Sequence, residues 1–160
     1  MRTATRLTTC VAAAVSMLLL ATTAIAQAPG GEPETSKQLA DVRRVTAKYH
    51  DLERAHADGY QPGSPCVPHM GYHYVRSIAA DQDELDPTAP NILIYAPRPD
   101  GRLRLVAVEY ASRAPATLFG RTFDPPGPAG PPFHTLHAWV WQANPDGTFA
   151  AHNRNISCGS

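Results

Sequence analysis

The chain has 160 residues, which is enough for one domain with one hydrophobic core and cramped for two. Its 14 Lys and Arg residues balance 14 Asp and Glu residues, so the formal net charge at pH 7 is zero. Nucleic acid and anionic membrane surfaces both attract a concentrated basic face, and Arg43-Arg44 is the only adjacent basic pair in the sequence. Composition therefore argues against both kinds of partner.

Residues 1–26 have the three parts of a secretory signal peptide. Basic Arg2 and Arg6 precede an apolar stretch at residues 11–21, and small residues lead up to Ala26. A transmembrane anchor is the alternative, but the apolar stretch is shorter than the roughly 20 residues that span a bilayer. We therefore predict cleavage after Ala26, a secreted or periplasmic location and no membrane anchor in the mature protein.

The cysteines fit an exported protein. Cys10 lies in the predicted signal peptide, so that Cys66 and Cys158 remain in the mature chain. An even number of cysteines in an oxidising compartment favours a disulfide, while a thiolate metal ligand is the alternative for either sulfur. We predict a Cys66–Cys158 bond that holds the C-terminal tail beside residues 68–71.

The pattern changes near residue 35. Residues 27–34 are rich in Gly and Pro and are expected to form a flexible leader, followed by a single domain at residues 35–160. Thr35 and Gln38 resemble a capping box at the start of a helix that we predict at residues 36–58. Its apolar stripe consists of Leu39, Val42, Val45, Tyr49, Leu52 and His56. An amphipathic helix of this kind must pack against another element.

Strands are predicted after the helix from apolar, aromatic and β-branched runs. Their ranges are residues 71–77, 91–96, 103–112, 134–141 and 148–151. Asp-Gly pairs, which are strong hairpin signals, lie between the second and third ranges and between the fourth and fifth. The predicted fold class is α+β, with one long N-terminal helix packed on a curved antiparallel sheet of about five strands.

A Pro/Gly-rich segment at residues 124–132 separates the two predicted hairpins. Proline has no backbone N–H, so this segment cannot donate a regular hydrogen-bond ladder and must be loop or extended chain. It is either a surface connector or a flap over a pocket, since long loops on rigid scaffolds often carry sites.

Histidine placement is the main chemical clue. All seven histidines follow the predicted signal peptide, and His69 with His73 and His134 with His137 form two pairs. Neutral imidazoles from neighbouring strands are good ligands for copper and zinc. His134 and His137 point to opposite faces if both lie on the strand, so a single site combines His137 with His73 and with His69 from the preceding loop. The same parity places Trp139 and Trp141 on the face of His137.

Glu109 completes this predicted site. It lies within an apolar strand, where a carboxylate is costly unless it is paired or bound to a metal. We therefore predict that copper or zinc is bound by His69, His73, Glu109 and His137, for carriage, sensing or a metal-assisted reaction. A salt bridge from Glu109 to Arg76, Arg104 or Arg113 is the alternative.

A metal-free pocket is the second functional hypothesis. A small-ligand-binding module or an enzyme would use His73 or His137 for acid–base chemistry, with Glu109 orienting the imidazole. The other residues that could line such an apolar pocket are Tyr72, Tyr74, Tyr110, His134 and Trp139. A third hypothesis is a structural or partner-binding domain whose histidines are scattered, with His50 solvated and His56 at the edge of the core.

Several common chemistries lack their sequence patterns. The chain has no Cys-x-x-Cys-His haem attachment motif and no Gly-x-Ser-x-Gly nucleophile elbow. Its glycines do not have a phosphate-cradling spacing, so the sequence does not indicate a nucleotide cofactor.

Several short motifs follow the predicted helix. These are Met-Gly-Tyr-His-Tyr at 70–74, Val-Ala-Val-Glu-Tyr at 106–110, Leu-His-Ala-Trp-Val-Trp at 136–141, Asn-Pro-Asp-Gly at 144–147 and the C-terminal Cys158. Together they resemble a family of small uncharacterised exported bacterial proteins. The resemblance covers most of the chain after the signal peptide. It implies a single exported domain and carries no activity over to this protein.

Overall fold

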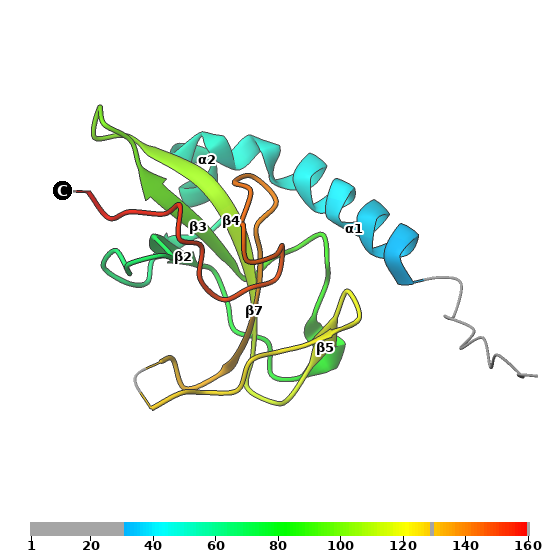
Figure 1. The fold of residues 1–160 in the computed structure, drawn as a ribbon. Helices are drawn as coiled ribbons and strands as arrows, with labels where there is room; N and C mark the ends of the chain where they lie inside the picture. The colour runs from blue at the N-terminus through cyan, green and yellow to red at the C-terminus, as the bar shows by residue number, and fades with distance from the viewer. Residues whose placement is uncertain (1–30, 129, 160) are drawn as a thin grey trace, which may run out of the picture.

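A computed structural model describes residues 31–128 and 130–159 (Figure 1). The predicted signal peptide and its cleavage site lie outside these residues. Helices cover one face of a five-stranded antiparallel sheet, which confirms the predicted α+β class, although the sheet is not strongly curled. The helical elements are α1 (Gly31–Thr46), η1 (Ala47–His50), α2 (Leu52–Ala57) and η2 (Gln82–Glu84). The strands are β1 (Gln61–Pro62), β2 (Tyr72–Val75), β3 (Ile92–Pro97), β4 (Leu103–Ser112), β5 (Thr117–Leu118), β6 (Arg121–Thr122) and β7 (His134–Ala138).

Helix α1 begins earlier than the sequence predicts. It starts at Gly31, so residues 31–34 of the predicted leader are helical. Glu32 and Glu34 place negative charge in the first turn, where the helix dipole favours it, and proline is tolerated there because the first N–H groups have no partner within the helix. The Gly/Pro composition that predicts a leader thus also suits a helix start.

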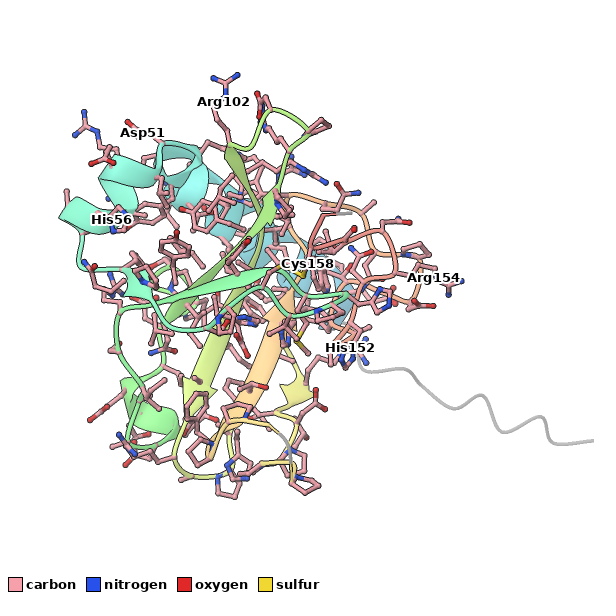
Figure 2. The ribbon with its side chains drawn as sticks, turned by 90° about the vertical axis from the view of Figure 1, so that its left-hand side faces the viewer. Asp51, His56, Arg102, His152, Arg154 and Cys158 are labelled. Carbon is pink, nitrogen blue, oxygen red and sulfur yellow. A yellow bond between two sulfur atoms is a disulfide. The ribbon has the colours of Figure 1, made fainter. Side chains whose placement is uncertain are left out.

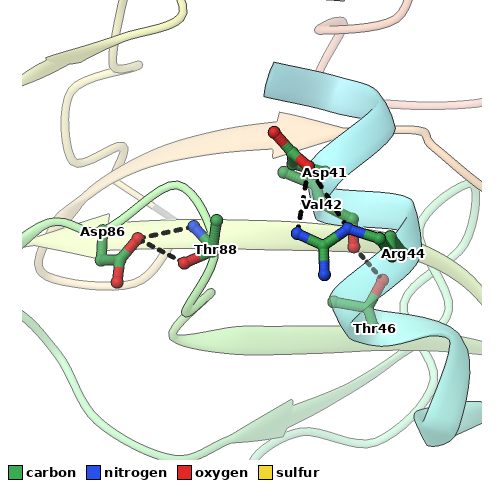
Figure 3. Close-up of polar contacts among 6 residues, drawn as sticks. All are labelled: Asp41, Val42, Arg44, Thr46, Asp86 and Thr88. Carbon is green, nitrogen blue, oxygen red and sulfur yellow. Dashed lines mark hydrogen bonds and ion pairs between the residues drawn. The ribbon is translucent and has the colours of Figure 1, made fainter. Parts of the chain in front are cut away.

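The predicted single helix at residues 36–58 is interrupted near Thr46. The Thr46 hydroxyl donates to the Val42 carbonyl at 2.7 Å, a bond that often bends helices, and the chain tightens into η1 (Figure 3). Asp51 then has an extended backbone, and its side chain accepts from the Glu53 N–H at 3.0 Å as the N-cap of α2 (labelled in Figure 2). Gly59, with φ +92°, follows the second helix as predicted.

The order of strands in the sheet is β1-β2-β3-β4-β7. Strand β4 has the predicted bounds, whereas the predicted strand at residues 148–151 is a series of turns in the described structure. Gly147 N–H donates to the Asn144 carbonyl and Ala150 N–H to the Gly147 carbonyl. Thr148 accepts one backbone bond, from Trp139 N–H at 2.9 Å just after β7, and no regular ladder forms along residues 148–151. The short strand β1 is the fifth strand in its place.

Side chains alternate between the two faces of the sheet and form two separate clusters. Under the helices, Tyr74, Tyr95 and Tyr110 pack in the main core, and the Tyr95 hydroxyl donates to the Tyr49 carbonyl at 2.7 Å. A smaller cluster on the opposite face contains Ile94, Ala96, Val106, Ala107, Trp139 and Ile156. The face away from the helices is therefore covered by loops and by the C-terminal segment.

The C-terminal segment is fixed at several points. Cys66 and Cys158 form the predicted disulfide, with Cα atoms 5.7 Å apart (Figure 2). The Asn153 N–H donates to the His69 carbonyl at 2.8 Å, and the buried Asn153 amide donates to Ala143. These bonds hold the tail against the second face of the sheet. No helix within residues 31–128 and 130–159 has the length and apolar character to cross a membrane.

Candidate metal centre

Three strands bring His73, Glu109 and His137 together on the face of the sheet away from the helices. Glu109 on β4 is directly opposite His137 on β7. His73 on β2 is paired with Ile94 of β3, and Ile92 of the same strand is paired with Glu109. The long side chains of His73 and Glu109 therefore meet diagonally across β3, which the alternation of side chains on these strands allows.

The distances in this group suit a small cation. His73 Nε2 lies 3.6 Å from Glu109 Oε2, and His137 Nε2 lies 3.7 Å from Glu109 Oε1. Both distances exceed normal hydrogen-bond lengths. One ligand atom from each residue lies within 4.8 Å of the other two. Tetrahedral zinc with bonds of about 2.1 Å separates its ligand atoms by roughly 3.4 Å, so the group can hold a metal ion after a small adjustment.

Glu109 and His137 are buried and incompletely bonded, and His73 is largely buried. Their exposed fractions are 13% for His73, 4% for Glu109 and 3% for His137. Glu109 Oε2 and both ring nitrogens of His137 have no hydrogen-bond partner among the described residues. Leaving buried polar atoms unpaired costs about 1–3 kcal/mol each. An ion between the side chains would contact Glu109 Oε2 and His137 Nε2 and remove part of this cost.

Burial also sets the protonation of the group. It raises the pKa of Glu109 to about 8, against a smaller lowering effect of a hydrogen bond from the Thr135 side chain. Burial lowers the pKa of His73 to about 4. It lowers the pKa of His137 to about 3, with further lowering from His73 and His152 nearby. At pH 7 the imidazoles are therefore neutral, as metal ligation requires, and the group holds one proton on Glu109.

Ser64 orients the His73 ring, and sequence reasoning missed it. The Ser64 hydroxyl donates to the Pro65 carbonyl at 2.8 Å, and Ser64 Oγ lies 3.0 Å from His73 Nδ1. Because the hydroxyl proton is already used, Oγ accepts from Nδ1–H. This tautomer leaves a lone pair on Nε2, directed at Glu109. Such a partner beside a metal-ligating histidine is a common feature of protein metal sites.

His69 is not part of this group. Its side chain is exposed, its backbone has φ +64°, and its carbonyl accepts from the C-terminal segment. A loop residue next to a predicted ligand is easily included by spacing alone, because the sequence does not give the direction in which a turn points its side chain.

The arginine and scattered-histidine alternatives find little support. Arg76 donates to the carbonyls of Ala89 and Pro90, and Arg104 donates to Gln142, so neither pairs with Glu109. His50 packs against Trp141 and His56 contacts the Tyr60 carbonyl, both away from the three-residue group.

A cavity of about 610 Å³ adjoins the three-residue group. The Pro/Gly-rich segment forms part of its wall through Gly127, Pro128, Gly130 and Pro131. Other lining side chains are Ser64, Val67, Met70, Val75, Ile92, Phe133, Thr135 and His152. The segment at residues 124–132, for which the sequence allows either a surface connector or a flap, thus borders a pocket beside the candidate site.

The aromatic residues predicted for the pocket lie elsewhere in the described structure. Tyr72, Tyr74 and Tyr110 face the helices, where they contribute to the main core. His134, three residues before His137 on β7, is on the opposite face from it, as the alternation requires. Trp139 stacks on His137 with ring centroids 6.1 Å apart, but it is not among the described residues that line the cavity.

Trp141 does not share the face of His137, because β7 ends at Ala138 rather than at residue 141. The chain turns there, and the Trp141 indole N–H donates to Thr46 on the helix side at 3.1 Å. Strand parity therefore fails for this residue, which lies beyond the end of the regular strand.

The chain matches no family model, no curated protein and no solved structure. The resemblance to small exported bacterial proteins stays a prediction.

Proposed function

We propose that the protein binds one divalent transition-metal ion, zinc or copper, through His73 Nε2, the Glu109 carboxylate and His137 Nε2. The observation that carries this proposal is the convergence of ligand groups from three strands, two of which, Glu109 and His137, are buried with unpaired atoms among the described residues. Buried imidazoles and carboxylates without partners are destabilising in isolation, whereas a cation between them is bound by all three.

The donor set favours a transition-metal ion such as zinc or copper over Ca²⁺ and Mg²⁺. Two imidazole nitrogens and one carboxylate oxygen suit these borderline metals better than Ca²⁺ or Mg²⁺, which prefer oxygen ligands. Both described cysteines are in the disulfide, so thiolate ligation does not compete. The disulfide also supports a secreted or periplasmic location, where such bonds persist.

Three protein ligands leave one coordination position for a water or another molecule. Structural zinc sites are usually closed by four protein ligands, whereas sites that exchange a ligand keep one position open. The adjoining cavity gives such a molecule room. The site therefore suits carriage, sensing or a metal-assisted reaction better than a purely structural role.

Calorimetric titration of metal-free protein with Zn²⁺ and Cu²⁺ tests the proposal. We expect one ion per chain for the wild type, and a loss of affinity of about 100-fold or more for His73→Ala and for His137→Ala. His50→Ala is the matched control, because His50 is exposed and lies away from the site. Equal stoichiometry and affinity in all four proteins would rule the site out.

A metal-free acid–base site is the second candidate function. It is favoured by a carboxyl group with a raised pKa beside two neutral imidazoles at a cavity wall. The same titration separates the two candidates, because a site of this kind needs no metal. Absence of zinc and copper binding by folded wild-type protein would favour it.

A further inference from the structure

The cavity beside the candidate metal centre is lined by both polar and apolar groups. His73, Glu109 and His137 form part of its wall, and Val67, Val75, Ile92 and Phe133 contribute apolar surface. A volume of about 610 Å³ is within the range of roughly 300–1,000 Å³ found for small-molecule pockets. The cavity is therefore large enough for a small molecule as well as the ion.

Charge balance restricts what can occupy it. A divalent ion held by two neutral imidazoles and the Glu109 carboxylate leaves one net positive charge in a buried place. Among the described lining residues, Glu109 is the one carboxylate, so no second acidic side chain neutralises this charge. Uncompensated buried charge is costly, and a singly negative ligand on the open coordination position removes it.

Several residues that line the cavity are exposed, so a ligand of this kind can reach it from solvent. His152, an exposed residue of the C-terminal segment, lines the cavity and is labelled in Figure 2. Gly127, Pro128 and Pro131 line another part of the wall and are exposed as well. None of these exposed lining residues is acidic, so none of them repels an anion.

From these observations we propose that the metal-loaded site binds a small monocarboxylate with an apolar body. Its carboxylate oxygen occupies the open position on the ion, and its apolar part lies against the cavity wall near Phe133. This inference rests on the proposed metal-binding function. A dicarboxylate would leave excess negative charge, and a neutral molecule would leave the positive charge uncompensated.

The test is calorimetry on zinc-loaded wild-type protein with three probes: phenylacetate, the neutral analogue phenylacetamide, and acetate. We expect phenylacetate to bind about tenfold more tightly than either of the others, because it alone offers both the charge and the apolar body. Metal-free protein should not distinguish phenylacetate from phenylacetamide. Phe133→Ala should weaken phenylacetate binding about tenfold and leave zinc affinity unchanged.

Phe149→Ala is the matched control, since Phe149 is half-buried and stacks on Phe119 outside the cavity. Zinc binding with no preference for phenylacetate over phenylacetamide overturns the carboxylate site and leaves the metal centre standing. An unchanged phenylacetate affinity in Phe133→Ala also overturns it. Failure to bind zinc at all overturns both the metal centre and the carboxylate site.

Discussion

Ser64 Oγ lies 3.0 Å from Nδ1 of His73, and because the Ser64 hydroxyl donates to the Pro65 carbonyl, we infer that Nδ1 carries the ring proton. The serine comes from the segment between β1 and β2, while the histidine is on β2 itself. With Nδ1 protonated, Nε2 has its lone pair free at 3.6 Å from the Glu109 carboxylate. The candidate metal centre therefore depends on a residue that binds no metal itself.

Removing the Ser64 hydroxyl should weaken metal binding. For Ser64→Ala we expect the zinc affinity to fall about 10-fold, at the low end of the range measured for such partners, because the ring can then adopt the other tautomer or rotate. Ser64→Thr keeps the hydroxyl and should retain most of the affinity. Calorimetric titration with Zn²⁺ measures the effect.

Ser36→Ala is the control for this prediction, since Ser36 is exposed on α1 away from the site. Equal zinc affinity in Ser64→Ala and the wild type would show that Ser64 does not orient His73. A loss in Ser64→Thr as large as in Ser64→Ala would point to packing rather than to the hydroxyl.

The sequence allows a good part of this fold to be predicted. Hydrophobic periodicity finds the helix region and the runs that become β2, β3, β4 and β7, because these signals arise from local geometry. Periodicity gives the wrong structure where the same residues suit two local structures, such as a hairpin and a series of tight turns. Asn144 and Gly147 form tight turns after β7, although Asp-Gly pairs usually signal a hairpin.

In the candidate site, too, the residues on strands are predicted from the sequence and those in loops are not. Parity on the strands correctly predicts that His73, Glu109 and His137 share a face, because alternation is a property of each strand. His69 and Ser64 lie in the connection before β2, where direction depends on turn geometry and tertiary contacts. The sequence therefore gives no reliable sign that Ser64 contacts the site while the His69 side chain is exposed.

Metal binding should release one proton from the site near neutral pH. Burial raises the pKa of Glu109 to about 8, so the metal-free site is protonated at pH 7, whereas a bound ion requires the carboxylate. Zinc titrations in buffers of different ionisation enthalpy should report about one proton released per ion at pH 7, and fewer above pH 8.

The apparent zinc affinity should accordingly rise almost tenfold per pH unit below pH 7, less steeply as pH approaches 8, and level off above that. A zinc affinity that stays constant across this range would show that Glu109 is already ionised in the metal-free protein. It would also contradict the effect of burial on its pKa.

The stability of the metal-free protein should pass through a maximum near pH 6.5. His73 and His137 have pKa values of about 4 and 3 in the folded state, against 6.5 when unfolded. The unfolded chain thus binds more protons, and stability from these residues is lost as pH falls through this range. Glu109 has the opposite effect, because its pKa of about 8 exceeds the unfolded value of 4.5.

Between pH 4.5 and 6.5 the two histidines outweigh the single carboxyl, so their sum makes stability rise with pH. Above pH 6.5 the histidines of the unfolded chain lose their remaining protons and Glu109 outweighs them, so stability falls up to about pH 8. Urea unfolding at half-unit pH steps measures this profile, and Glu109→Gln is the control that should remove the fall above pH 6.5. A fall of equal size in Glu109→Gln would assign it to other groups.

Glu109 should destabilise the metal-free protein. Its side chain is 4% exposed, and Oε2 has no hydrogen-bond partner among the described residues. Replacing such a group by an apolar side chain of similar size often stabilises, so Glu109→Leu should raise the free energy of unfolding of metal-free protein by about 1–3 kcal/mol at pH 7.

The same Glu109→Leu substitution should abolish the stabilisation that zinc gives the wild type, because ligand binding to the folded state is what raises its apparent stability. Urea unfolding with and without Zn²⁺ measures both effects on one variant. Val108→Leu, on the neighbouring position but facing the helices, is a control for general repacking of β4. A Glu109→Leu protein that is less stable than the wild type without metal would mean that the carboxyl is satisfied in the folded state, and the case for an ion between the three side chains would lose its energetic basis.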